Sequence, residues 1–181
     1  GAAFIKLAHL LYLRRKPIRT TAPLDLGKDV EVLHWNESHR DLFADAILAS
    51  YERTLDCPGL LGLRDADDII RGHMASGRFD PQLWYALHCR NEPIGVMLLS
   101  LVPQRNAMEL VYLGVALKYR GRGLARKLVE HALGVAKHSG VSSLILAVDE
   151  QNIAAVSLYR SMKFVPNARK LAMILTLPKT C

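Results

Sequence analysis

Apolar and polar positions follow two different periods along this chain, and together they predict alternating strands and helices. Apolar residues recur at helical spacing in residues 41–51, 66–75, 124–139 and 153–162. Alternating or β-branched runs predict strands at residues 30–35, 83–89, 94–102, 108–116 and 143–148, and a final hairpin that ends at Leu177. Residues 90–93, Arg-Asn-Glu-Pro, predict the turn between the second and third strands, and Ser38 is the expected N-cap of the first helix. The pattern predicts a mixed sheet with helices on both faces.

The first 28 residues precede this pattern. Residues 1–16 form an apolar segment and residues 17–28 a Pro-containing linker, so the main domain is expected at residues 29–181. Residues 6–13, KLAHLLYL, match residues 170–177, KLAMILTL, at five of eight positions. This echo favours a strand near the N-terminus. The strand would be the end of a preceding domain of the same kind, or it would complete a sheet in this chain or in a partner; a coincidental match of common apolar residues is the alternative.

The most informative stretch is residues 111–125, VYLGVALKYRGRGLA. An apolar run ends at Lys118, a cluster of Arg and Gly follows, and a helical pattern begins immediately afterwards. The first N–H groups of a helix have no intrahelical acceptor, and the helix dipole places partial positive charge there, so this turn is a candidate phosphate site. The turn lacks the Lys-Ser/Thr of a P-loop and is not G-x-G-x-x-G, which disfavours a nucleoside triphosphate or a dinucleotide.

Two blocks of this sequence resemble one protein family. The turn at residues 120–125 has the form [Q/R]-x-x-G-x-[G/A] and resembles the acetyl-CoA pyrophosphate loop of the GNAT (Gcn5-related N-acetyltransferase) superfamily. Residues 147–164, AVDEQNIAAVSLYRSMKF, are similar to the second signature of that family, although Lys163 stands where a glycine is usual. The resemblance implies the GNAT fold, an α/β (α+β) class with a mixed, mostly antiparallel sheet of about six to seven strands. It also implies an N-acetyltransferase that moves an acetyl group from acetyl-CoA to an amine by direct transfer in a ternary complex.

The resemblance implies which residues hold the cofactor. Backbone amides of the turn would bind the pyrophosphate, and a Cβ at either of its glycines would hold the phosphates away. Pantetheine would lie beside the preceding strand, where Gly114 is consistent with a bulge or a close approach. Asn152 would cap the next helix or contact pantetheine, and these roles are compatible. The expected cofactor-binding residues are Leu113, Val115, Arg120, Gly121, Arg122, Gly123, Ala125, Arg126 and Asn152.

Two further residues could carry the chemistry. An amine of the lysine type has a pKa of about 10.4 and must lose a proton before it attacks. The resemblance implies Glu109 as the base, and strand alternation would place it on one face with Val111 and Leu113; a solvated carboxylate is the alternative. The resemblance also places the phenol of Tyr159 near the cofactor sulfur, where it could protonate the leaving thiolate. The alternative is a core tyrosine.

Composition narrows the picture. The length of 181 residues suits one domain, and the net charge of +7 admits an acidic partner. An anionic cofactor would account for the basic residues around the turn, and no basic stripe is interleaved with aromatic residues, so nucleic acid is disfavoured. A second basic cluster lies near the N-terminus and comprises Arg14, Arg15, Lys16 and Arg19.

The cysteines and the lengths of the apolar runs bear on metal binding and on the cellular location of the protein. Three cysteines without C-x-x-C spacing predict neither a disulfide framework nor a zinc site, so we expect no metal and a cytoplasmic protein. No apolar run reaches the roughly 18 residues of a membrane span. His131 and His138 are expected at a helix surface, and the loop with Asp56 and Cys57 is expected to shape the acceptor pocket. The expected partners are acetyl-CoA and an unidentified amine, and a homodimer is left open. A catalytically silent CoA-binding module and a basic nucleic-acid or ribosome-associated protein are the competing functions.

Overall fold

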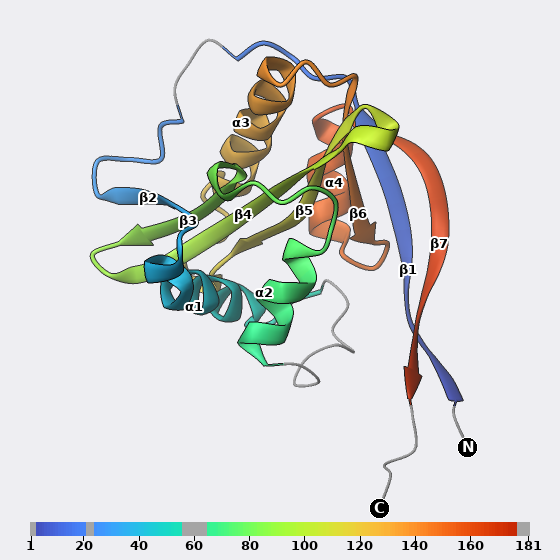
Figure 1. Cartoon of the computed structure of the whole chain (residues 1–181), viewed down its shortest axis with the longest axis horizontal. Helices are drawn as coiled ribbons and strands as arrows, with labels where there is room; N and C mark the ends of the chain where they lie inside the picture. The colour runs from blue at the N-terminus through green and yellow to red at the C-terminus, as the bar shows by residue number, and fades with distance from the viewer. Residues whose placement is uncertain (1–2, 21–23, 56–64, 177–181) are drawn as a thin grey trace, which may run out of the picture.

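The computed structural model describes residues 3–20, 24–55 and 65–176 (Figure 1). Its strands form a seven-stranded sheet in the order β2-β3-β4-β5-β6-β1-β7. Neighbouring strands are antiparallel except β5 and β6, which run parallel. The strands are β1 Ala3–Arg15, β2 Val30–His34, β3 Trp84–Cys89, β4 Glu92–Val102, β5 Ala107–Val115, β6 Ser143–Asp149 and β7 Val165–Thr176. The helices are α1 Arg40–Tyr51, α2 Ala66–Met74, α3 Leu124–His138 and α4 Ile153–Ser161. The expected fold class is confirmed.

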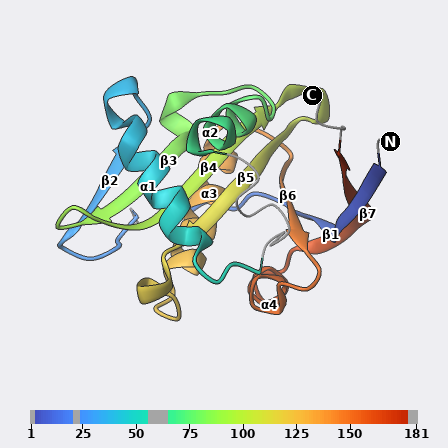
Figure 2. The ribbon, with the colours of Figure 1, turned by 90° about the horizontal axis from the view of Figure 1, so that it is seen from below.

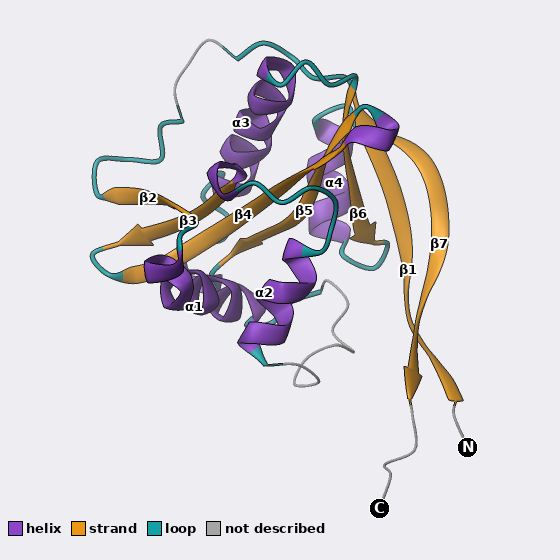
Figure 3. Ribbon diagram, in the orientation of Figure 1, coloured by secondary structure: helices purple, strands orange, loops and turns teal. Residues whose placement is uncertain are grey.

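The sheet has helices on both faces (Figures 2 and 3). Strand β3 shows why, because its side chains alternate between two hydrophobic clusters. Trp84 and Ala86 pack in the cluster that contains residues of α1 and α2. Tyr85 and Leu87 pack in the cluster that contains residues of α3 and α4. A strand covered on both faces is apolar throughout, which explains the continuous apolar runs of β3 and β4.

The local turn signals gave mixed results. The turn between β3 and β4 is confirmed: Arg90 and Asn91 have φ of 51° and 66°, as a type I′ hairpin turn requires. The N-cap expected at Ser38 is wrong. The side chain of Asn36 instead accepts a hydrogen bond from His39 N, starting a 3₁₀ turn that leads into α1, and the Ser38 hydroxyl donates to the same Asn36 oxygen.

The expected C-terminal hairpin is also wrong, because β7 is one continuous strand. Strand β1 lies between β6 and β7 and pairs antiparallel with both, so it supplies the partner that a hairpin would have provided. The strand expected near the N-terminus is therefore present, in the sheet of its own chain. The two halves of the sequence echo pair in part, with Lys6 opposite Met173, Ala8 opposite Ala172 and Leu10 opposite Lys170. That β1 derives from a preceding domain stays a prediction.

The stretch expected to be a linker packs against the domain. Residues 17–20 leave the end of β1 and pass the end of α3, and residues 24–28 lead toward β2, which lies at an edge of the sheet (Figure 1). Pro17 is buried, and Leu24 and Leu26 pack against the cluster beneath α3. Thr20 lies so close to Gly134 of α3 that a Cβ added at Gly134 would meet Thr20 Cβ and Cγ2 at 3.2 Å. The described part of this stretch is thus held on the outer face of α3.

Candidate active site

A cleft opens where β5 and β6 separate. The two strands pair only from Ala107 to Leu110 on β5 and from Ser143 to Leu146 on β6. Strand β5 continues to Val115 with β4 on one side and, among the described strands, no partner on the other. An inner cavity of about 140 Å³ and an outer cavity of about 410 Å³ lie along this opening. The unpaired edge of β5 offers main-chain groups to an extended ligand, as an edge strand does to an added strand.

The outer cavity ends at the start of α3. Gly121 and Gly123 have φ of 73° and 78°, the left-handed region that glycine adopts without strain. Gly123 is the N-cap of α3, no side chain caps the helix, and its first turn contains no acidic residue. A Cβ at either glycine would meet nothing within 4 Å, so the glycines serve the backbone conformation in this structure. The uncapped, electropositive start of α3 therefore fits an anionic ligand.

The side chain of Arg120 is bonded to carbonyl oxygens of the chain itself. Its Nε donates to the carbonyl oxygen of Val115 at 2.9 Å. Its guanidinium also donates to the carbonyl oxygens of Ser50, at 2.9 Å, Glu52, at 2.8 Å, and Arg53, at 3.3 Å. These bonds satisfy carbonyl groups at the C-terminus of α1 and join that end to the end of β5. The side chain borders both cavities but is occupied in holding their walls together.

Other residues expected to bind the cofactor converge on the opening. Leu113, Val115, Asn152 and Tyr159 line both cavities. The Asn152 side chain accepts a hydrogen bond from Ala155 N at 3.2 Å, which confirms it as the N-cap of α4. The Tyr159 ring is buried, so it is a core residue that also borders the cleft.

The basic side chains of the turn take separate directions. Ala125 and Arg126 line the outer cavity with the two glycines. Arg126 also donates a hydrogen bond to Ser161 Oγ at 2.6 Å. Arg122 lines neither cavity; its guanidinium carbon lies 5.1 Å from the centroid of the Tyr119 ring. The electropositive character of the turn therefore comes chiefly from the helix start and Arg126.

The expected alternation of β5 holds for Glu109 and Val111 but fails at Leu113, because a β-bulge intervenes. Leu99 pairs with Leu110 and Leu98 pairs with Tyr112, which leaves Val111 as the extra residue. Glu109 and Tyr112 therefore share the α1–α2 face of the sheet, and Leu113 points to the other face. Glu109 lies just before the strands separate and lines neither cavity. Burial raises the pKa of its carboxyl group above the usual value, and the charge of Arg105 partly opposes this.

Gly114 lies beyond the bulge rather than in it. The close-approach interpretation holds: a Cβ there would lie 2.5 Å from Ser50 Cβ and 2.9 Å from Tyr112 Cε1. The sequence did not reveal that Ser50, Thr54 and Tyr112 line the inner cavity. Tyr112 Oη and Ser50 Oγ are 2.7 Å apart and share a hydrogen bond. These residues are 62 positions apart in the sequence, so no local pattern could have joined them.

With this geometry in place, comparison with known proteins is decisive. A model of the acetyltransferase (GNAT) family matches residues 36–164. The chain belongs to this family. It is similar to N-alpha-acetyltransferase 30 of Saccharomyces cerevisiae, with 36% identity over 78 residues that cover 41% of this chain and 44% of that protein. Peptidyl-lysine N-acetyltransferase YjaB of Escherichia coli is 32% identical over 105 residues, which cover 58% of this chain and 61% of the relative. The chain thus spans less than two thirds of the length of either relative.

A solved structure agrees with the fold. The crystal structure of a GCN5-related N-acetyltransferase from Sphaerobacter thermophilus superimposes with a TM-score of 0.68 at 18% identity. The match covers 94% of this chain and 52% of that chain. The superposition therefore extends well beyond residues 36–164, the region that carries the GNAT family match.

The remaining predictions for this GNAT chain concern two histidines, the loop after α1 and a metal site. His138 is exposed, but His131 is half-buried with its ring 5.3 Å from that of Tyr85, and burial lowers its pKa, so a surface position for His131 is wrong. Asp56 and Cys57 lie outside the described residues.

Within the described ranges, no group of three His, Cys, Asp or Glu side chains is placed to hold a metal ion. No helix among those residues has the length and apolar character needed to cross a membrane.

Proposed function

We propose that this chain is an N-acetyltransferase that transfers the acetyl group of acetyl-CoA directly to an amine in a ternary complex. One observation carries the proposal: the unpaired edge of β5, the uncapped start of α3 and the buried Tyr159 border one continuous opening. The GNAT match covers all three features. Acetyl-CoA combines a pyrophosphate, an amide-containing arm and a thioester. The start of α3 would bind the pyrophosphate, the edge of β5 the arm, and Tyr159 would lie near the thioester.

Binding and positioning rest on backbone groups. The amides at the start of α3 would hold the pyrophosphate without a side-chain competitor. Main-chain groups of Leu113 and Val115 would align the pantetheine amides as an added strand does. Asn152 would border this arm where it passes the start of α4. Arg120, held by carbonyl oxygens, keeps the end of β5 and the end of α1 at a fixed separation.

Two side chains would move protons. Tyr159 would protonate the thiolate that leaves along this opening, a role supported by its position at the border of both cavities. Glu109 would accept the proton of the amine through water, because it lies at the apex of the cleft and lines neither cavity. Burial raises its pKa, and a carboxylate with a higher pKa is a stronger base at neutral pH.

The test is a thiol-release assay with acetyl-CoA and a panel of amines, polyamines, amino acids and peptides. Peptides with a free N-terminus or a lysine come first, because the two named relatives act on such amines according to their names. Tyr159→Phe should reduce turnover by roughly 10²-fold while the rise in melting temperature caused by CoA is retained. A protein that shows no such rise with CoA would contradict the proposal.

A second candidate function is a CoA-binding module that holds CoA as a structural or sensory ligand without turnover. The position of Glu109 outside both cavities favours it, because the expected base then does not border the cleft. Binding of CoA with no thiol release across the whole panel would favour this silent module. Release that falls in Glu109→Gln, with unchanged CoA affinity, would instead establish the enzyme and assign the base.

A further inference from the structure

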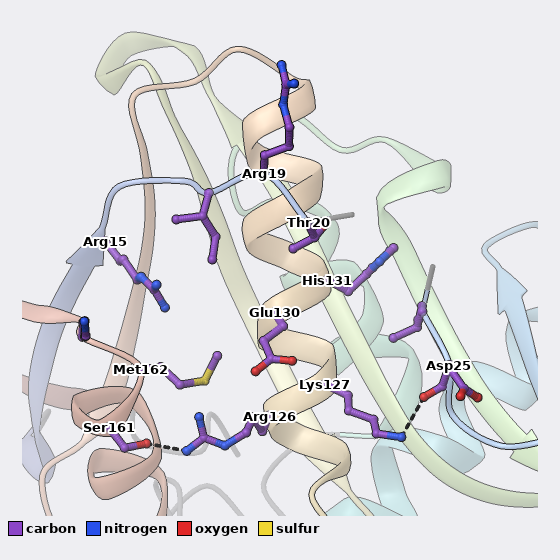
Figure 4. Close-up of a pocket in the computed structure, with 13 residues that line it drawn as sticks. Arg15, Arg19, Thr20, Asp25, Arg126, Lys127, Glu130, His131, Ser161 and Met162 are labelled. Carbon is purple, nitrogen blue, oxygen red and sulfur yellow. Dashed lines mark hydrogen bonds between the residues drawn. The ribbon is translucent and has the colours of Figure 1, made fainter. Parts of the chain in front are cut away.

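The two basic clusters of the sequence meet in one groove, on the outer side of α3 (Figure 4). The groove has a volume of about 640 Å³. One wall is α3, another is the end of α4 with Ser161 to Lys163, and the third is formed by residues 15–20 together with Leu24 and Asp25. Arg15 extends from the end of β1 toward the space beside α3 (Figure 4). The GNAT family match begins at residue 36, so the third wall lies outside the family region.

The groove carries an excess of positive charge. Its acidic lining residues are Asp25 and Glu130, and its basic ones are Arg15, Arg19, Arg126, Lys127 and Lys163. In the described ranges, Arg15, Arg19 and Lys163 take part in no ion pair. Burial lowers the pKa of His131, which also lines the groove, and so keeps it from adding to the charge at neutral pH. Several arginines around one space favour a ligand with several acceptor oxygens.

The walls are held in place by contacts that cross the groove. Lys127 Nζ donates to the carbonyl oxygen of Asp25 at 2.8 Å. Thr20 packs against Gly134, nearer the C-terminus of α3, where only a glycine leaves room for the threonine side chain. Arg126 is tied to Ser161 of α4. The N-terminal segment is therefore seated on α3, so that Arg15 and Arg19 line the same groove as Arg126 and Lys127.

Lys163 adds an independent observation. It follows α4 with a φ of 63°, a left-handed conformation that glycine adopts most readily and that is strained for other residues. This chain places at that position a lysine that lines the groove. A backbone outlier of this kind is a reason to look for function. A positive charge facing the groove is the property that lysine brings and glycine lacks.

We propose that this groove binds a phosphate monoester, as an anion site separate from the turn that would hold the pyrophosphate. The phosphate has two conceivable sources with the same chemistry. Arg126 lines both the groove and the outer cavity, so the 3′-phosphate of a bound CoA could reach the groove; this source rests on the proposed function. A free phosphorylated metabolite could occupy the groove without CoA. In both cases the N-terminal segment supplies part of the site.

Calorimetric titration of the 181-residue chain tests the proposal. The ligands are CoA, dephospho-CoA, which lacks only the 3′-phosphate, and inorganic phosphate. The test variant is Arg15→Gln/Arg19→Gln. The matched control is Arg14→Gln/Lys16→Gln, which removes the same charge from the same segment but from exposed residues that do not line the groove.

If CoA is the source, CoA should bind roughly tenfold more tightly than dephospho-CoA, as loss of charge-assisted hydrogen bonds predicts. That ratio should fall to about one in the test variant and persist in the control. If a free metabolite is the source, the two cofactors should bind equally, and inorganic phosphate should bind the control but not the test variant. Lys163→Gly should weaken the same interaction while it stabilises the fold.

The proposal is overturned if the ratio and the phosphate affinity are the same in the test variant and the control. A ratio that persists in the test variant excludes the 3′-phosphate of CoA as the source, and inorganic phosphate that then binds the test variant and the control equally overturns the proposal. Failure of both CoA and dephospho-CoA to bind would refute the proposed function, and the inorganic phosphate titration would still decide whether the groove is an anion site.

Discussion

Replacing Ala125 with glutamate should stabilise the fold and abolish CoA binding, two effects of one charge with opposite signs. Ala125 is the second residue of α3 and lines the outer cavity. The first turn of α3 contains no acidic residue, and no side chain caps it. A carboxylate in this turn would interact favourably with the helix dipole, a contribution of about 0.3–1 kcal/mol. In a protein of this size that should raise the melting temperature by about 1–4 °C.

The same carboxylate would occupy the place proposed for the pyrophosphate. Two like charges roughly 5 Å apart repel by about 3 kcal/mol at an effective dielectric constant of about 20. A pyrophosphate brings at least two such charges, and each 1.4 kcal/mol is tenfold in affinity, so binding should weaken by more than about 10²-fold. The loss should be partly relieved by salt, because the site is open to solvent.

Urea denaturation and calorimetric titration with CoA measure the two effects. Ala125→Gln is the matched control, because glutamine has the same shape without the charge. The reasoning predicts that Ala125→Glu is at least as stable as Ala125→Gln and binds CoA far more weakly. Equal CoA affinity in the two variants would refute a pyrophosphate site at the start of α3. A glutamate variant that is less stable than the glutamine variant would refute the uncapped helix start.

Three further predictions concern stability. Arg120→Met should lower the free energy of unfolding by about 2–4 kcal/mol in urea, because charged hydrogen bonds to carbonyl oxygens are lost; a loss below about 0.5 kcal/mol would contradict the clamp. Gly114→Ala should cost about 1–3 kcal/mol through overlap with Ser50, and adding Ser50→Gly should recover part of that loss, whereas strict additivity would contradict the contact. His88 is 3% exposed, and neither ring nitrogen has a hydrogen-bond partner among the described residues. Burial lowers its pKa, so it stays neutral in the folded chain. Its contribution to stability is therefore present above about pH 6.5 and lost as the pH falls through the folded-state pKa, and His88→Leu should flatten this dependence in denaturation at several pH values.

The elements that the sequence predicted well are those whose signals are local. The glycine turn and the start of α3 follow from the sequence of residues 120–125. Helix α4 and its N-cap Asn152 follow from the sequence of residues 147–164. The backbone requirement of each glycine also follows from its immediate neighbours. For this reason the turn and the helix start that border the cleft could be expected from the sequence alone.

The features that could not be predicted depend on distant partners. The bulge at Val111 reflects how β5 aligns with β4, and it moves Glu109 to the other face from Leu113. The C-terminal hairpin fails because β1, from the opposite end of the chain, pairs with β7. The bonds from the Arg120 guanidinium to carbonyl oxygens of α1 and the residues after it also join distant parts of the chain. The contact between Ser50 and Tyr112 is likewise non-local.

Hydrogen exchange with and without acetyl-CoA tests the central claim most directly, because it reports both binding and location. Peptides that cover residues 111–126, the unpaired half of β5 and the start of α3, should exchange more slowly when acetyl-CoA is present. Peptides from β2, at the far edge of the sheet, should be unchanged and serve as the internal control. Unchanged exchange in residues 111–126 at saturating acetyl-CoA would contradict an acyl-CoA site between β5 and β6.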